Sequence, residues 1–190
     1  MIVCGVDIGT TNLKVVVADA AGRLLAQVSQ PAPRREQDGV PVTDPGALLA
    51  FVETMIAQAW REAGAVEPIA AIATAGVGED GFLVDSNLRP RSNAIPWFDG
   101  RAAAEAEELE TSHPSQLRTG LTFEPTRTAA KWLWLSRHTL PTENAVWLAL
   151  TDFPLAAWSG KPFISKTLAA RTACYAHALR GPALLLGHAE

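Results

Sequence analysis

Cysteine, tyrosine and long apolar runs are scarce in this sequence of 190 residues, which contains two cysteines and one tyrosine. Two isolated cysteines, Cys4 and Cys174, cannot form a disulfide framework, and they fit a reducing cytoplasm. No uncharged apolar run approaches the ~18 residues that a membrane span needs. The start MIVCGVDIGTTN lacks the basic region of a signal peptide. We therefore expect a cytoplasmic protein that does not enter a membrane.

An excess of positive charge is also absent. Lys and Arg number 16 against 20 Asp and Glu, which gives a net charge of -4. Because no basic block stands out, we expect no nucleic-acid partner. The four histidines are scattered, and none forms a metal-ligand pair at helical spacing. The length indicates one domain, large enough for a full core.

The first half of the chain is rich in strand patterns. MIVCGVDI, LKVVVADA and RLLAQVSQ predict three antiparallel strands joined by the turns GTTN and DAAGR. A polar loop is expected over 31–45. Asp44 and Pro45 then predict the start of a helix, which Gly64 ends. IAAIATA, at 69–75, predicts a short buried strand, and GFLVD predicts another.

The second half is mainly helical in pattern. Helices are expected at DGRAAAEAEELE, HPSQLRTGL, TRTAAKWLWLSRH and FPLAAWSG, with AVWLALTD as a strand or buried segment. The element order indicates an α/β fold with a mixed β-sheet flanked by helices. It lacks the regular βαβαβ rhythm of a doubly wound nucleotide domain.

The stretch Gly76–Gly81 reads as G-x-G-x-x-G, the pattern of a dinucleotide-binding loop. That fingerprint needs a helix after the glycines, since the helix N-terminus holds the pyrophosphate. Here Phe82 to Asp85 predict a strand, so the glycines are interpreted as a bend between strands. Glu79 and Asp80 argue for more than a bend, because two adjacent carboxylates beside buried strands cost desolvation unless they are wet or bind something.

The turn in VDIGTTNLKVVV is a better phosphate candidate. Gly9 lets the backbone approach a ligand closely, while Thr10 and Thr11 offer hydroxyls and amides in an anion-binding arrangement. Lys14 adds positive charge, and Asp7 can hold a magnesium ion. A plain hairpin turn, with Thr and Asn chosen for turn chemistry, explains the same residues equally well.

Four motifs in order resemble a known family. Asp-x-Gly-Thr-x-x-x-Lys, beginning at Asp7, resembles the first phosphate motif of the actin, Hsp70 and sugar-kinase superfamily. AIPWFDGRA resembles the Trp-x-Asp-x-Arg segment of the FGGY carbohydrate kinases. TGLTFEPTRTAAKWLWL and LALTDFPLAAWSGKPFISKTLAARTACY are similar to two later segments of that family. The resemblance runs from Val3 to about Tyr175, and it implies a ribonuclease H-like (actin-like ATPase) domain.

FGGY kinases transfer the γ-phosphoryl group of ATP to a hydroxyl of a sugar or polyol. The resemblance implies that Asp7 belongs to the magnesium and phosphate site, and that Gly9, Thr10, Thr11 and Lys14 hold the phosphates. It thus implies ATP and Mg²⁺ as cofactors.

The resemblance also implies a substrate site. Gly78 and Glu79 match the family pair that hydrogen-bonds substrate hydroxyls, and the neighbouring Asp80 is also expected to bind the substrate. Trp97 matches an aromatic wall beside the substrate, although core packing is its common alternative. Thr126 falls where glycerol-type members place a tyrosine. Because Gly78 and Thr126 depart from the glycerol pattern, a larger polyol or sugar is expected.

Further residues are expected to support this site or the core. The resemblance implies that Asp99 and Arg101 support the Trp97 segment, with Asp99 among the substrate-site residues, while Arg101 is otherwise expected on a solvated face with the Glu-rich helix. For five tryptophans we expect core positions: Trp60, Trp132, Trp134, Trp147 and Trp158.

The family's Asp that orients the attacking hydroxyl is expected beyond the matched segments, since the last Asp of this chain is Asp152. The second lobe, which holds adenosine, is also expected outside it. Residues 1–190 are therefore interpreted as an amino-terminal, sugar-binding domain with little activity alone, which could form a homodimer. A non-catalytic nucleotide-binding module of the actin/Hsp70 type is the alternative.

Overall fold

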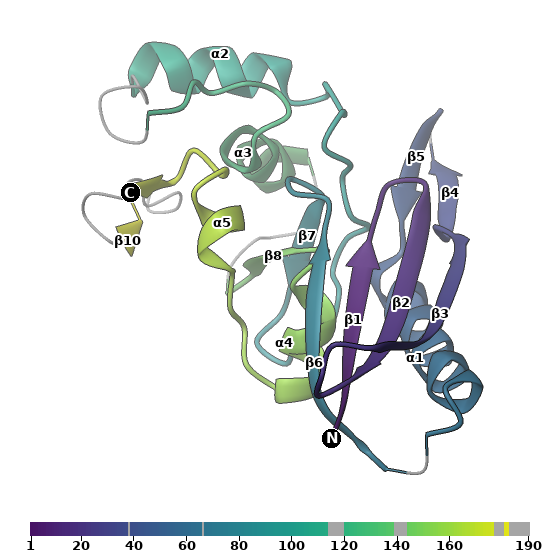
Figure 1. Ribbon diagram of the computed structural model, residues 1–190. Coiled ribbons are helices and arrows are strands. Elements are labelled where there is room, and N and C mark those ends of the chain that lie inside the picture. The colour runs from purple at the N-terminus through teal and green to yellow at the C-terminus, as the bar shows by residue number, and fades with distance from the viewer. Residues whose placement is uncertain (38, 66, 114–119, 139–143, 177–180, 183–190) are drawn as a thin grey trace.

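A computed structural model (Figure 1) describes residues 1–190 except 38, 66, 114–119, 139–143, 177–180 and 183–190. A four-stranded mixed sheet has the strand order β3-β2-β1-β6. It consists of β1 (Ile2–Ile8), β2 (Asn12–Asp19), β3 (Leu24–Pro31) and β6 (Ile69–Gly76). β1 pairs antiparallel with β2 and parallel with β6. The three-stranded meander expected from the sequence is confirmed.

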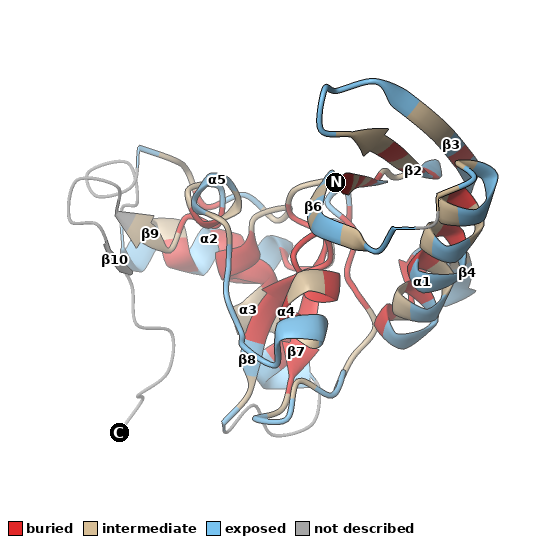
Figure 2. Cartoon of the chain, turned by 60° about the horizontal axis from the view of Figure 1, so that its bottom comes forward, coloured by how far each residue is buried: buried red, intermediate tan, exposed pale blue. Residues whose placement is uncertain are grey.

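Helix α1 (Pro45–Glu62) covers one face of this sheet. It begins at Asp44, whose Oδ1 accepts hydrogen bonds from the amides of Gly46 and Ala47 at 2.9 and 3.1 Å. This cap satisfies two of the amides that a helix start leaves unpaired. The buried stripe of α1 is visible in Figure 2. This stripe packs in one core with alternate residues of β1 and β2. The members are Leu48, Val52, Met55 and Ala59 of α1, Val6 and Ile8 of β1, and Leu13, Val15 and Val17 of β2.

The expectation of a polar loop at 31–45 is wrong. The segment contains an antiparallel hairpin of β4 (Arg34–Gln37) and β5 (Val40–Thr43). Val42 and Thr43 are buried, and Gly39 has a φ of 76°, a conformation that glycine adopts without steric cost. Burial of two β-branched residues outweighs the polar composition of the rest of the segment.

Residues 69–75 form the expected strand, but the expectation that this strand is buried is wrong. β6 forms as predicted, but no residue in it is buried. The strand lies at the edge of the sheet as the described residues form it. An apolar run therefore indicated the strand correctly and its environment incorrectly.

The rest of the chain forms a second group of elements beside the sheet (Figure 1). A ribbon of β7 (Gly81–Val84) and β8 (Val146–Ala149) is antiparallel. The helices are α2 (Ala103–Ser112), α3 (Thr128–His138), α4 (Phe153–Ser159) and α5 (Lys166–Ala169), followed by the short pair β9 (Tyr175–Ala176) and β10 (Gly181–Pro182). Most of the helix expected at 113–121 lies outside the described residues. In the described part of the chain, no helix has the length and apolarity needed to cross a membrane.

Candidate functional site

Two loops leave the central sheet at the same edge. β1 and β6 run parallel, and Ile8 is paired with Gly76 where both strands end. The amide of Val77 donates to the carbonyl of Ile8 at 3.0 Å. A Cβ at Gly76 would collide with that carbonyl, so glycine is required for this close approach. The turn after β1 and the loop after β6 are thereby held together.

The turn after β1 has the features of an anion site. The amide of Gly9 donates to the carbonyl of Asn12 at 3.1 Å, and a Cβ on Gly9 would lie 2.6 Å from the same oxygen. The amides of Thr10 and Thr11 donate to no acceptor among the described residues. Exposed backbone N–H groups in a tight turn suit phosphate oxygens. The amides of Thr10 and Thr11 are therefore available to a ligand.

Asp7 and Lys14 lie on this edge as a facing pair. They are paired across β1 and β2, both are exposed, and both line a depression of about 230 Å³ that extends over β6. The described residues contain no cluster of three or more metal-ligating side chains. Magnesium, however, often takes one or two carboxylates and completes its shell with water and phosphate oxygens. A single carboxylate at Asp7 fits that mode.

The loop after β6 contains Glu79, whose carboxylate is buried against the start of α3. Its φ is 73°, a left-handed conformation that is uncommon outside glycine. Oε1 accepts from Nη1 of Arg127, and Oε2 accepts from the amide and the hydroxyl of Thr128, each at 3.2 Å. Since a carboxylate can accept about four hydrogen bonds, one position is left for a ligand. Burial raises the pKa of Glu79, and Arg127 opposes that shift.

Asp80 points to different partners. One of its oxygens accepts from the amide of Trp97 at 2.6 Å, and the other accepts from Nη2 of Arg34 at 3.0 Å. Burial raises the pKa of Asp80, while the bond from Trp97 and the charge of Arg34 lower it. The sequence placed Asp80 next to a substrate. In the structure both of its oxygens have protein donors, and the bond from the Trp97 amide holds the Trp97 segment against Asp80.

Lys131 joins the Glu79 loop to the segment that carries Trp97. The side chain is fully buried, and Nζ donates to the carbonyls of Glu79 and Pro96 at 2.8 Å each. Burial lowers the pKa of Lys131 to about 8, and the charges of Asp80 and Glu79 counteract the shift. This buried ammonium clamps the Glu79 loop to the segment that carries Trp97.

A cavity of about 340 Å³ is lined by residues of both segments. We call it the polar cavity. Its lining residues are Val77, Gly78, Glu79, Trp97, Glu124, Thr126, Arg127 and Arg171. Trp97 is 46% exposed and contacts Phe98 edge to face, which rules out core packing. The structure thus brings four of the residues expected at the substrate site, Gly78, Glu79, Trp97 and Thr126, into the lining of one cavity.

Asp99 does not line the polar cavity. Its carboxylate accepts from the amide, Nε and Nη2 of Arg101 at 2.7–2.9 Å. Burial raises the pKa of Asp99, but the bonds from Arg101 outweigh it and lower the pKa below its ordinary value. The guanidinium of Arg101 also lies 5.1 Å from the ring centre of Trp134. The expectation of a merely solvated Arg101 is wrong, since it is packed on both sides.

Two arginines of the polar cavity were missed by the sequence reasoning. Arg127 precedes α3, and Arg171 follows α5, about ninety residues from the Glu79 loop. Both reach Glu79, at 3.2 and 3.6 Å. Arg171 lies in the Ala-x-Arg-Thr run that carried the resemblance, so a signal was present, but spacing along the chain does not reveal the convergence.

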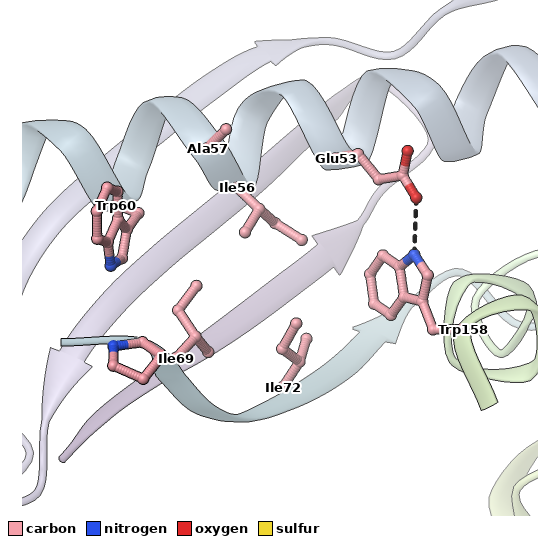
Figure 3. Close-up of a pocket in the computed structure, with 8 residues that line it drawn as sticks. Glu53, Ile56, Ala57, Trp60, Ile69, Ile72 and Trp158 are labelled. Carbon is pink, nitrogen blue, oxygen red and sulfur yellow. Dashed lines mark hydrogen bonds between the residues drawn. The ribbon is translucent and has the colours of Figure 1, made fainter.

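A second, larger depression differs from the polar cavity in its chemistry. About 500 Å³ in volume, it lies between α1, β6 and α4. We call it the apolar groove. Its lining residues are Glu53, Ile56, Ala57, Trp60, Pro68, Ile69, Ile72 and Trp158. Figure 3 shows the polar contact across it, in which the indole N–H of Trp158 donates to Glu53 at 2.9 Å.

The prediction of a core position is wrong for Trp158, which is 37% exposed. It lies close to the end of α4, where Gly160 turns the chain at the surface, and its ring faces the groove (Figure 3). Trp147 is buried, and Trp132 and Trp134 are partly buried against the core. Trp60 lines the apolar groove.

The fold and motifs match known proteins. Residues 2–173 match the model of the FGGY family of carbohydrate kinases, N-terminal domain. Xylulose kinase of Escherichia coli (strain K12) is 30% identical over 141 residues, which is 70% of this chain and 28% of that protein. Erythritol kinase of Brucella abortus (strain 2308) is 36% identical over 136 residues, which is 67% of this chain and 24% of that protein.

Solved structures agree on the fold. Xylulose kinase from Rhodospirillum rubrum superposes with a TM-score of 0.85 at 22% identity, covering 94% of this chain and 38% of that one. This likeness confirms the expected actin-like α/β fold. The chain spans less than a third of the length of the relatives named above. The match covers nearly all of the described residues, so the chain belongs to the FGGY family of carbohydrate kinases, as an N-terminal domain.

Proposed function

We propose that this chain carries the substrate site of an ATP-dependent carbohydrate kinase, which phosphorylates a hydroxyl of a sugar or polyol. The observation that carries the proposal is the polar cavity of about 340 Å³, which is lined by Glu79 and by the exposed Trp97. The cavity opens beside the sheet edge that bears the anion-binding turn.

Substrate recognition follows from the chemistry of these groups. Glu79 accepts a hydrogen bond from a substrate hydroxyl at its remaining position. The face of Trp97 covers the apolar side of the carbon chain. Gly78 leaves room for the ligand, and Thr126, which also lines the cavity, is assigned as a further polar contact. Asp80 and Asp99 are assigned to holding the Trp97 segment.

The phosphates are proposed to bind at the neighbouring turn. The amides of Thr10 and Thr11 donate to the phosphate oxygens, Gly9 lets the backbone approach them closely, Lys14 supplies a positive charge, and Asp7 is a ligand of Mg²⁺. When bound, ATP supplies the γ-phosphoryl group, and Mg²⁺ neutralises the charge that develops on it. The protein's part is to hold the acceptor hydroxyl and the phosphates in line.

Phosphoryl transfer also needs a group that orients the attacking hydroxyl. We place this group and the adenosine site in a carboxy-terminal lobe outside residues 1–190. The 190-residue chain then binds substrate without turning it over. A cytoplasmic location and a possible homodimer belong to the same proposal. The match to carbohydrate kinases favours this function over a nucleotide-binding module of the actin/Hsp70 type.

The relatives act on xylulose, glycerol and erythritol, as their names state. Gly78 and Thr126 depart from the glycerol pattern, which favours a polyol or sugar with more than three carbons. Calorimetric titration of the 190-residue protein with glycerol, erythritol, xylitol and D-xylulose tests this. We expect one of the longer ligands to bind more tightly than glycerol, and Glu79→Ala to abolish that binding.

Two results would contradict the proposal. One is an absence of binding by every ligand of the panel, and the other is unchanged binding by the Glu79→Ala protein. A coupled assay for phosphorylated product tests the division between lobes, which robust turnover by the 190-residue protein would refute.

A further inference from the structure

Arg171 brings hydrogen-bond donors into the polar cavity that the described residues do not use. Its side chain is 57% exposed, and Nε lies 3.6 Å from Oε1 of Glu79, beyond hydrogen-bond distance. Among the described residues, its guanidinium meets no hydrogen-bond acceptor. Five N–H donors on a rigid fork are therefore available at the cavity wall.

The neighbouring Arg127 differs in this respect. Its side chain is 17% exposed, it donates to Glu79 at 3.2 Å, and its Nη2 lies 3.5 Å from Glu124. Arg127 is thus held by two carboxylates and orients Glu79. Arg171 is the less restrained of the two guanidinium groups that line the polar cavity.

Gly78 is matched to Arg171. Its backbone does not lie in the left-handed region, so its conformation does not call for glycine. A Cβ at position 78 would instead lie 3.2 Å from Nε of Arg171 and 3.2 Å from Cδ2 of Leu168. These distances are tighter than ordinary packing, so the absent side chain makes room for Arg171 over the loop.

The charges around the polar cavity favour a neutral ligand. Glu79 and Glu124 balance Arg127 and Arg171 among its lining residues. A hydroxyl group both donates and accepts. A pair of neighbouring hydroxyls can therefore donate to the Glu79 carboxylate and accept from the Arg171 guanidinium, with 3.6 Å between those two groups.

We propose that Arg171 is a specificity-determining residue, which donates hydrogen bonds to a hydroxyl of a neutral polyol or sugar while the adjacent hydroxyl donates to Glu79. This role rests on the proposed function, since it requires a polyol or sugar in the polar cavity. Gly78 keeps the guanidinium in place for that contact.

The test is an NMR titration of the 190-residue protein with xylitol and, as an anionic probe, D-gluconate. We expect Arg171→Gln to weaken xylitol binding by ~10-fold, as the loss of a charge-assisted hydrogen bond does. Arg171→Lys keeps the charge without the planar fork and should lose part of the affinity. Arg91→Gln, an exposed arginine outside the cavity, is the matched control and should bind as the unaltered protein does.

A double-mutant cycle separates contact from general damage. Gly78→Ala should weaken xylitol binding more in the unaltered background than beside Arg171→Gln, because only in the first case does it also displace the guanidinium. If the unaltered protein binds neither D-gluconate nor any ligand of the calorimetric panel, the proposed function falls, and the role of Arg171 falls with it. If xylitol binds equally well to the unaltered and Arg171→Gln proteins, the role of Arg171 alone is overturned. Tighter binding of D-gluconate than of xylitol overturns the assignment of a neutral ligand.

Discussion

The polar cavity and the apolar groove both contain an exposed tryptophan and a glutamate, yet their chemistry differs. In the apolar groove, Trp158 donates its indole N–H to Glu53, and the rest of the lining is almost entirely apolar. In the polar cavity, Glu79 is buried among cationic and hydroxyl donors, while Trp97 presents its ring. The groove is the larger of the two. Convergent polar groups, and not volume, therefore locate the candidate site.

The largest expected effect is at the base of the polar cavity. Lys131→Met leaves the carbonyls of Glu79 and Pro96 without their donor and removes a buried positive charge from beside carboxylates. We expect the free energy of unfolding to fall by about 3 kcal/mol, as measured by urea denaturation. The exposed Lys161→Met is the control and should change it by less than about 0.5 kcal/mol. Equal stabilities of the two variants would contradict a clamp at Lys131.

The same substitution at one glutamate of each region tests whether only the polar cavity binds substrate. Glu79→Gln keeps the shape of the side chain but weakens the acceptor, so we expect at least ~10-fold weaker binding of xylitol by calorimetry. Glu53→Gln makes the same change in the apolar groove and should leave binding unaltered. Equal effects of the two substitutions on affinity would contradict the assignment of substrate binding to the polar cavity.

Acid should weaken binding through Glu79. Because burial raises the pKa of this carboxyl above its ordinary 4.5, the group takes up its proton as pH falls while still above that value. The protonated form is a poorer acceptor, so the affinity for xylitol should drop at a pH higher than 4.5 and recover as pH rises. Titrations at several pH values measure this. In Glu79→Gln the step should disappear, and its persistence there would assign it to another group.

The smallest effects are expected from the two exposed tryptophans. Trp97→Ala should weaken xylitol binding but change the unfolding free energy by less than about 0.5 kcal/mol. Trp158→Ala should do the reverse, lowering stability by about 1 kcal/mol through lost packing against α1 without a change in affinity. Thermal unfolding and calorimetry on both variants distinguish these outcomes. A loss of affinity in Trp158→Ala would contradict the division between the regions.

Local sequence signals predicted the parts of the fold that depend on neighbours in the chain. The β-branched runs indicated β1 and β2, and the cap at Asp44 indicated the start of α1. A strand after the G-x-G-x-x-G stretch was also expected. β7 begins at the last glycine of that stretch, Gly81, where a dinucleotide loop would lead into a helix.

Features that depend on tertiary contacts were not predictable in this way. The exposure of β6 depends on its position at the sheet edge, and that of Trp158 depends on where α4 ends. Arg34 and Arg171 reach the Asp80 and Glu79 carboxylates from distant parts of the chain. The sequence therefore predicted Glu79 and Trp97 as candidate substrate-binding residues, but it did not reveal the arginines that lie around Glu79.

The central claim is that the polar cavity binds the hydroxyls of a sugar or polyol, and an NMR titration tests it directly. The two exposed tryptophans carry indole N–H groups that NMR can follow separately during a titration with xylitol or D-xylulose. If the polar cavity binds the ligand, we expect the Trp97 indole signal to shift in a saturable manner while the Trp158 signal stays in place. A saturable shift of Trp158 with Trp97 unmoved, or no shift of either signal, would contradict it.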